Sequence, residues 1–151
     1  MVQVNMMISI DPGITTGLVI AKFSSMTDIK PVVAIDSRDI SVIIDTVNSY
    51  IETHGAEVII VEDFVGSGFR SKDTKATIEL LGFVKSYYGI IMEQLVVVQQ
   101  PQFRKHCYNE SKTILSKHKI NKVHHAKDAF AHLIAYCIKE HGYEKKYDLP
   151  S

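Results

Sequence analysis

An apolar run that stops abruptly at an acid places the strongest constraint on how this chain can fold. Residues 6–10 are long enough for a buried strand, and Asp11 follows them directly, before Pro12 and Gly13. Proline and glycine end strands, so the carboxylate is left at the tip of a core element. Burying such a group is costly unless a cation or hydrogen bonds compensate it. The fold is therefore expected to supply a positive partner at this point.

Two further acids occupy comparable places. Glu62 ends the apolar run that starts at position 57, and Asp128 opens the apolar face of a helical pattern over 129–138. His125 comes three residues before Asp128, so the two should share one face of that helix. If these ends meet, oxygen-rich ligands favour magnesium or manganese. Two such ions could activate a water molecule and stabilise a leaving oxygen.

Each acid also has an ordinary explanation. Asp11 suits a turn that contains proline and glycine, and Asp128 suits the first turn of a helix, where it favours the dipole. Glu62 could be a surface acid at a strand end, and Asp63, on the opposite face, competes for its role. A first-turn histidine such as His125 is often solvated. The hypothesis of a metal site therefore depends on the combination of these residues.

Apolar spacing predicts strands over 4–11, 17–23, 31–36, 57–62 and 93–99, and helices over 40–54, 74–88 and 124–141. Gly55, Gly89 and Gly142 are expected to end the helices. Pro101 should open a short helical turn, and a basic linker is predicted from there to Asn121. Short connections favour an antiparallel meander of the first three strands, and right-handed crossovers make the last two parallel to the first. The predicted fold class is α/β, a mixed five-stranded sheet with helices on both faces.

Composition narrows the class of protein. The 151 residues are expected to form a single domain over 1–151, with 46% hydrophobic and 23% charged residues. No run approaches the about 18 apolar residues of a membrane span. The amino-terminal stretch lacks the features of a signal peptide. The two cysteines, Cys107 and Cys137, show no disulfide or zinc pattern. We expect a cytoplasmic protein without a membrane partner.

A net charge of zero conceals a strong asymmetry along the chain. Residues 1–63 contain three basic and nine acidic residues, a balance of −6, whereas 99–127 contain seven basic residues and one acid, a balance of +6. An acidic half that could hold metal and a basic segment that could hold phosphate together favour a polyanionic substrate. The same lysines would also suit a merely solvated surface.

Taken in order, these motifs resemble the RuvC-type Holliday-junction resolvases of the ribonuclease H-like superfamily. The resemblance rests on Ile10-Asp11-Pro12-Gly13 with Thr16-Gly17, on Val61-Glu62, on Leu80-Leu81-Gly82 and on His125-Ala126-Lys127-Asp128-Ala129-Phe130-Ala131. It spans nearly the whole chain. It implies a ribonuclease H-like fold and an endonuclease that resolves four-way DNA junctions by symmetric nicking. It also implies a homodimer in a bacterial or phage-infected cell, and a phage-type member of the family.

The resemblance further implies roles for individual residues. Asp11 would be shared by two Mg²⁺ ions, for which Mn²⁺ would substitute, while Glu62 and Asp128 would be further ligands. His125 lies where the family has an acid or a histidine. An aromatic residue should wedge into the junction. Phe64 is displaced by one position from the expected place and Phe69 lies further along, so both are candidates. The stretch between Lys105 and His125 is short and polar for the family. The expected DNA contacts are Phe64, Phe69, Arg70, Lys72, Lys75, Arg104, Lys105, Lys112, Lys119 and Lys122.

Three alternatives remain open on the sequence. One is a less selective nuclease for branched DNA, and another is a non-catalytic nucleic-acid-binding scaffold on the same fold. The third is a phosphotransferase of the actin and sugar-kinase type, whose Asp-x-Gly turn contacts phosphate. That class needs a second, similar domain, for which 151 residues leave no room.

Overall fold

The computed structural model describes residues 5–63 and 72–147, apart from the side chains of Lys72 and Asp73. Its centre is a five-stranded sheet with the order β3-β2-β1-β4-β5. The strands are β1 (Asn5–Asp11), β2 (Thr16–Ser25), β3 (Asp28–Ser37), β4 (Val58–Glu62) and β5 (Val96–Gln99). The first three are antiparallel, and β4 is parallel to both β1 and β5. This arrangement confirms the predicted mixed sheet.

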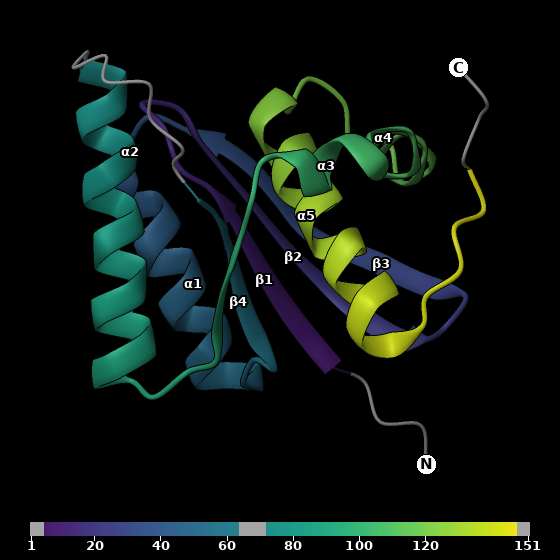
Figure 1. Ribbon diagram of the computed structural model, residues 1–151, viewed down its shortest axis with the longest axis horizontal. Helices are drawn as coiled ribbons and strands as arrows, with labels where there is room; N and C mark the ends of the chain where they lie inside the picture. The colour runs from purple at the N-terminus through teal and green to yellow at the C-terminus, as the bar shows by residue number, and fades with distance from the viewer. Residues whose placement is uncertain (1–4, 64–71, 148–151) are drawn as a thin grey trace.

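Helices cover both faces of the sheet (Figure 1). On one face lie α1 (Ile40–His54), α2 (Lys72–Phe83) and its continuation η1 (Val84–Ile91). On the other lie α3 (Gln102–His106), α4 (Tyr108–Lys117) and the long α5 (His124–His141). None of the helices within the described ranges is both long and apolar enough to cross a membrane.

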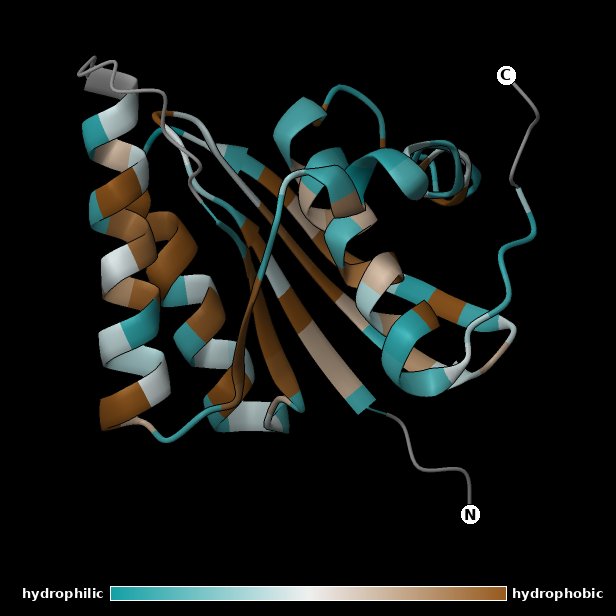
Figure 2. Ribbon diagram, in the orientation of Figure 1, coloured by the Kyte–Doolittle hydropathy of each residue, from teal (hydrophilic) through white to brown (hydrophobic). Residues whose placement is uncertain are grey.

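Side-chain alternation divides the strands between two apolar cores. In β1, Met7 packs into the core beneath α5, whereas Ile8 and Ile10 pack into the core beneath α1 and α2. The same alternation holds in β4, where Ile60 faces α5. The central strands are accordingly largely apolar, whereas the helices carry both apolar and hydrophilic residues (Figure 2). Continued to the strand ends, this alternation turns Asp11 and Glu62 toward α5.

The region predicted as a basic linker is helical, so that prediction is wrong. The buried residues of α4 are Glu110, Ser111, Ile114 and Leu115. They are spaced as one helix face, but half of them are polar, and this weakens the apolar periodicity that reveals a helix.

The prediction that Gly89 ends the second long helix is wrong. The chain stays helical, with π geometry, to Ile91, and the amide of Met92 donates to the carbonyl of Tyr87. Gly55 and Gly142 do follow the last residues of α1 and α5, both with positive φ angles. Among the described residues only these two glycines have a positive φ, and Gly142 adopts the left-handed conformation typical of a glycine that ends a helix.

Candidate active site

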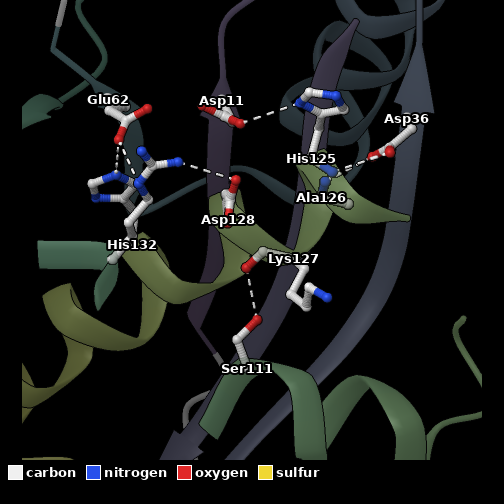
Figure 3. Close-up of polar contacts among 10 residues, drawn as sticks. Asp11, Asp36, Glu62, Ser111, His125, Ala126, Lys127, Asp128 and His132 are labelled. Atoms are coloured by element: carbon white, nitrogen blue, oxygen red, sulfur yellow. Dashed lines mark hydrogen bonds and ion pairs between the residues drawn. The ribbon is translucent and has the colours of Figure 1, made fainter. Parts of the chain in front are cut away.

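The carboxyl ends of two adjacent parallel strands bring the first two acids together. Ile10 of β1 pairs with Val61 of β4, so Asp11 and Glu62 are the next residues along each strand. Both side chains turn to the α5 side of the sheet (Figure 3). There they share a hydrogen bond. Asp11 is buried, with only 8% of its side chain exposed. The predicted meeting of these two acids is confirmed.

The first turn of α5 is fixed against the sheet from two sides. Asp36 of β3 accepts hydrogen bonds from the backbone amides of His125 (3.1 Å) and Ala126 (2.7 Å) (Figure 3). It thereby satisfies helix amides that the chain's own cap residue, Val123, leaves without a side-chain partner. On β2, a Cβ atom at Gly17 would lie 2.1 Å from the carbonyl carbon of His125. Only glycine therefore permits this approach.

This docking carries the two predicted helix residues to the strand ends. The Nδ1 atom of His125 lies 3.7 Å from Oδ2 of Asp11, and Asp128 lies beside it on the same face of α5 (Figure 3). A hydrogen bond of 2.7 Å from the hydroxyl of Ser111 to the carbonyl of Lys127 ties α4 to the same turn. Four side chains from three elements that are far apart in the sequence thus surround one edge of the sheet.

Arg104 of α3 lies between two of these acids. Its Nε atom is 3.2 Å from Oε1 of Glu62, and its Nη1 atom donates to Oδ2 of Asp128 at 3.1 Å. The sequence suggested a phosphate contact for this residue. In the structure its guanidinium group supplies the positive charge that the acids need. Its neighbour Lys105 is exposed and makes no such contact with them.

His132 was missed by the sequence analysis, although it is the most buried polar residue of the site. Its Nε2 atom lies 3.2 Å from Oε1 of Glu62, and its Nδ1 atom lies 3.3 Å from Oε1 of Gln99. A signal for it existed, because His132 is one helical turn after Asp128 and on the same face. Gln99 could have been found in the same way as Asp11, since it is the polar end of an apolar strand.

The electrostatics of the two strand acids are opposite. Burial, then the hydrogen bond and charge of Glu62 and the charge of Asp128, together raise the pKa of Asp11 to about 9, against the lowering effect of Arg104. Burial also raises the pKa of Glu62, but the close polar contacts with His132 and Asp11 and the charge of Arg104 outweigh it, and the pKa falls below its ordinary value. The two opposite shifts favour a proton on Asp11 and negative charge on Glu62.

The donor set fits a hard divalent cation. Three carboxylates and an imidazole are gathered, and the neighbouring acids disfavour ionisation of Asp11, so added positive charge would be stabilised here. Oε1 of Glu62 is fully buried and has no aligned hydrogen bond, although Arg104 and His132 both lie 3.2 Å from it. Within 5–63 and 72–147, however, no group of three potential ligands stands at metal-binding geometry.

A cavity of about 550 Å³ opens in front of these groups. Asp11, His125, Asp128 and Arg104 line it, together with the turn at 12–15. Arg38, which the sequence analysis did not select, also lines this cavity and is exposed. The site is therefore open to solvent and has an arginine at its edge, as an anionic ligand would require.

The remaining predicted DNA contacts are distributed over the surface. Phe64, Phe69 and Arg70 lie outside the described residues, as does the side chain of Lys72. Lys75 is exposed and pairs with Glu79 at 3.8 Å. Exposed lysines extend along α3, α4 and the connection to α5, namely Lys105, Lys112, Lys119 and Lys122.

Comparison with solved structures places this geometry on a known fold. Thermus thermophilus RuvC in complex with Holliday junction substrate is 15% identical, with 93% of this chain and 98% of that chain covered and a TM-score of 0.63. The fowlpox virus resolvase in complex with substrate Holliday junction DNA is 19% identical, with 86% and 97% covered and a TM-score of 0.59.

The chain has the RuvC fold. This confirms the predicted ribonuclease H-like architecture, with three antiparallel strands followed by two parallel ones. No protein-family model matches the sequence, and no curated protein is similar enough in sequence to match it. At the identities given above, the structural likeness establishes the fold.

Proposed function

We propose that this protein is a divalent-metal-dependent endonuclease that cuts four-way DNA junctions. One observation carries the proposal, namely the gathering of Asp11, Glu62, Asp128 and His125 at one edge of the sheet. The fold on which they gather is shared with RuvC and the fowlpox virus resolvase, whose structures contain Holliday junction DNA.

The three carboxylates would be the ligands, with His125 completing the set. Two Mg²⁺ ions, or Mn²⁺ in their place, would supply an activated water and stabilise the leaving oxygen when bound. For this chemistry Asp11 has to release its proton, which neighbouring positive charge favours. Arg104 has to leave the space between Glu62 and Asp128, and its guanidinium group then faces the cavity, where it can meet a phosphate.

The exposed lysines on α3, α4 and the following connection would hold DNA backbone phosphates with little reading of sequence. Two symmetric nicks across a junction require two active sites, so we propose a two-fold homodimer that matches the symmetry of the substrate.

The decisive experiment compares four-way, Y-shaped and linear DNA, each incubated with purified protein with and without magnesium. Metal-dependent cutting of the four-way junction alone is the expected result. Equal cutting of all three substrates would indicate a less selective nuclease, and binding without cutting would indicate a non-catalytic scaffold.

A pair of variants locates the site in the same assay. Glu62→Gln should abolish cutting, because it removes a carboxylate from the α5 side of the sheet. Asp63→Asn is the matched control, since Asp63 follows directly but its Oδ2 accepts a hydrogen bond of 3.0 Å from the side-chain amide of Gln100. Loss of cutting in Asp63→Asn with normal cutting in Glu62→Gln would contradict this assignment.

A further inference from the structure

Two glutamates frame β4, and each is paired with a histidine of α5. Glu57, just before the strand, has Oε2 at 2.6 Å from Nε2 of His141. Glu62, at the end of the strand, has Oε1 at 3.2 Å from Nε2 of His132. The pairs have the same chemistry but different surroundings. The side chains of the first pair are each 26% exposed, whereas His132 is completely buried and Glu62 is 13% exposed.

His132 is held on both sides of its ring. Nδ1 meets the side-chain amide of Gln99 at 3.3 Å, and Nε2 faces Glu62. The primary amide of Gln99 carries both a donor and an acceptor, so it can match either tautomer of the imidazole. The ring is thereby fixed in orientation beneath the carboxylate. Because its side chain has no solvent exposure, His132 cannot touch DNA itself.

We infer that His132, oriented by Gln99, is a positioning residue that holds Glu62 in place for the metal. The inference rests on the proposed function, in which Glu62 is a ligand. A glutamate side chain has three rotatable bonds, and a carboxylate that binds metal is effective only when its free rotation is restricted. Partners that hydrogen-bond to ligating carboxylates commonly contribute 10- to 100-fold to metal affinity. His132 is suited to this task, since its buried Nε2 atom lies 3.2 Å from Oε1 of Glu62 and has no other hydrogen-bond partner among the described residues.

Two substitutions of His132 separate positioning from simple packing. By bond count, the amide nitrogen of a glutamine reaches the place of Nε2, whereas that of an asparagine reaches only the place of Nδ1. His132→Gln therefore keeps a donor for Glu62, and His132→Asn keeps only the contact with Gln99. The matched control is His141→Asn, which breaks the other histidine–glutamate pair on the same helix, away from the cavity.

The measurement is Mn²⁺ binding to the full chain by calorimetry, without DNA. We expect His132→Asn to weaken Mn²⁺ binding by about 10- to 100-fold, His132→Gln to change it by only a few-fold, and His141→Asn to leave it unchanged. In a cleavage assay, the rate of His132→Asn should recover when Mn²⁺ is raised to saturation. Urea unfolding of each variant shows whether it is folded under the assay conditions.

Several results would overturn the inference. Equal loss of affinity in His132→Gln and His132→Asn would assign His132 to packing, and unchanged affinity in both would remove any role toward the metal. If wild-type protein binds no Mn²⁺, the inference also fails. If it binds Mn²⁺ in an Asp11-dependent way and His132→Asn weakens that binding, but no junction is cut, then the proposed nuclease function fails and the positioning role stands.

Discussion

Glu110 in α4 and Asp11 in β1 are both buried carboxylates, yet their surroundings differ completely. Glu110, 1% exposed, accepts hydrogen bonds from the hydroxyl of Tyr143 and from the backbone amides of Lys146 and Tyr147. Asp11, 6% exposed, faces the carboxylates of Glu62 and Asp128. The first acid is surrounded by donors, and the second is surrounded largely by further acids.

The difference separates a structural acid from a functional one. Around Glu110, donors from the segment that follows α5 anchor that segment to α4, and the pKa of Tyr143 is raised by burial and by its bond to Glu110. Around Asp11, no comparable set of donors is found among the described residues, and the shortage is only partly relieved by Arg104. Burial of an acid is common to both sites. A shortage of donors is what marks a place for an added cation.

The largest expected effect is the loss of catalysis when Asp11, the acid that is short of donors, is replaced. Asp11→Asn should lower the rate of junction nicking by about 10³-fold or more, because a metal ligand contributes several kcal/mol to the stability of the transition state. Folding should not suffer, since an asparagine resembles the protonated acid that the free protein holds. Single-turnover nicking at saturating Mg²⁺ measures the effect, and wild-type nicking by this variant would remove the metal site from the mechanism.

The corresponding change at Glu110 should affect stability instead. Glu110→Gln turns an amide group toward three donors and should lower the free energy of unfolding by about 1–3 kcal/mol, the usual penalty for unmatched buried polar groups. Urea unfolding curves measure it. The nicking rate per folded molecule should match wild type. A large catalytic loss without a loss of stability would mean that Glu110 belongs to the active site, and that the contrast is wrong.

The strand ends of the site were predictable because they follow from periodicity. Continuous apolar runs located β1 and β4, and parallel pairing with alternation then placed Asp11 and Glu62 on one face. The bounds of α1 and α5 agree with the predicted 40–54 and 124–141, since their apolar stripes are clear and glycines follow both.

The residues that support these acids could not be predicted from the periodicity of the sequence. Arg104 and Lys105 are adjacent in a basic run, and only the orientation of α3 decides which of them reaches the acids. Asp36 acts on α5 from a strand almost ninety residues earlier. His132 lies in an apolar helix face, where a histidine is indistinguishable in sequence from a core residue until Glu62 and Gln99 are seen beside it.

A third test uses pH to sharpen the contrast in the absence of metal. The pKa of Asp11 is about 9 in the folded protein, above its ordinary value near 4 in an unfolded chain. Ionised Asp11 therefore destabilises the fold, and the penalty is absent below about pH 4 and grows as the pH rises toward the folded value. Compared with Asp11→Asn, the free energy of unfolding of the wild type should fall by at least about 1.4 kcal/mol over this pH range, which is the equivalent of one pKa unit.

Urea unfolding of both proteins in EDTA at pH 5 and pH 8 measures that loss. The difference between the two proteins isolates Asp11, because all other groups titrate in both. Equal stability differences at the two pH values would show that Asp11 is not held in a carboxylate-rich, donor-poor setting.

The smallest expected effect concerns Arg104, whose positive charge lies against Glu62 and Asp128, where the added cation is proposed to bind. Arg104→Gln removes a guanidinium group that lies against Glu62 and Asp128 and would repel a divalent cation at the same acids. Because Arg104 is about one-third exposed and its interactions are screened, the gain in Mn²⁺ affinity should be modest, about 1 kcal/mol. Lys105→Gln, one position further along the same helix, is the control and should leave Mn²⁺ binding unchanged. Weaker Mn²⁺ binding by Arg104→Gln would instead mean that the arginine orders the acids for metal rather than standing in for it. In that case the shortage of donors around Asp11 would no longer explain the site.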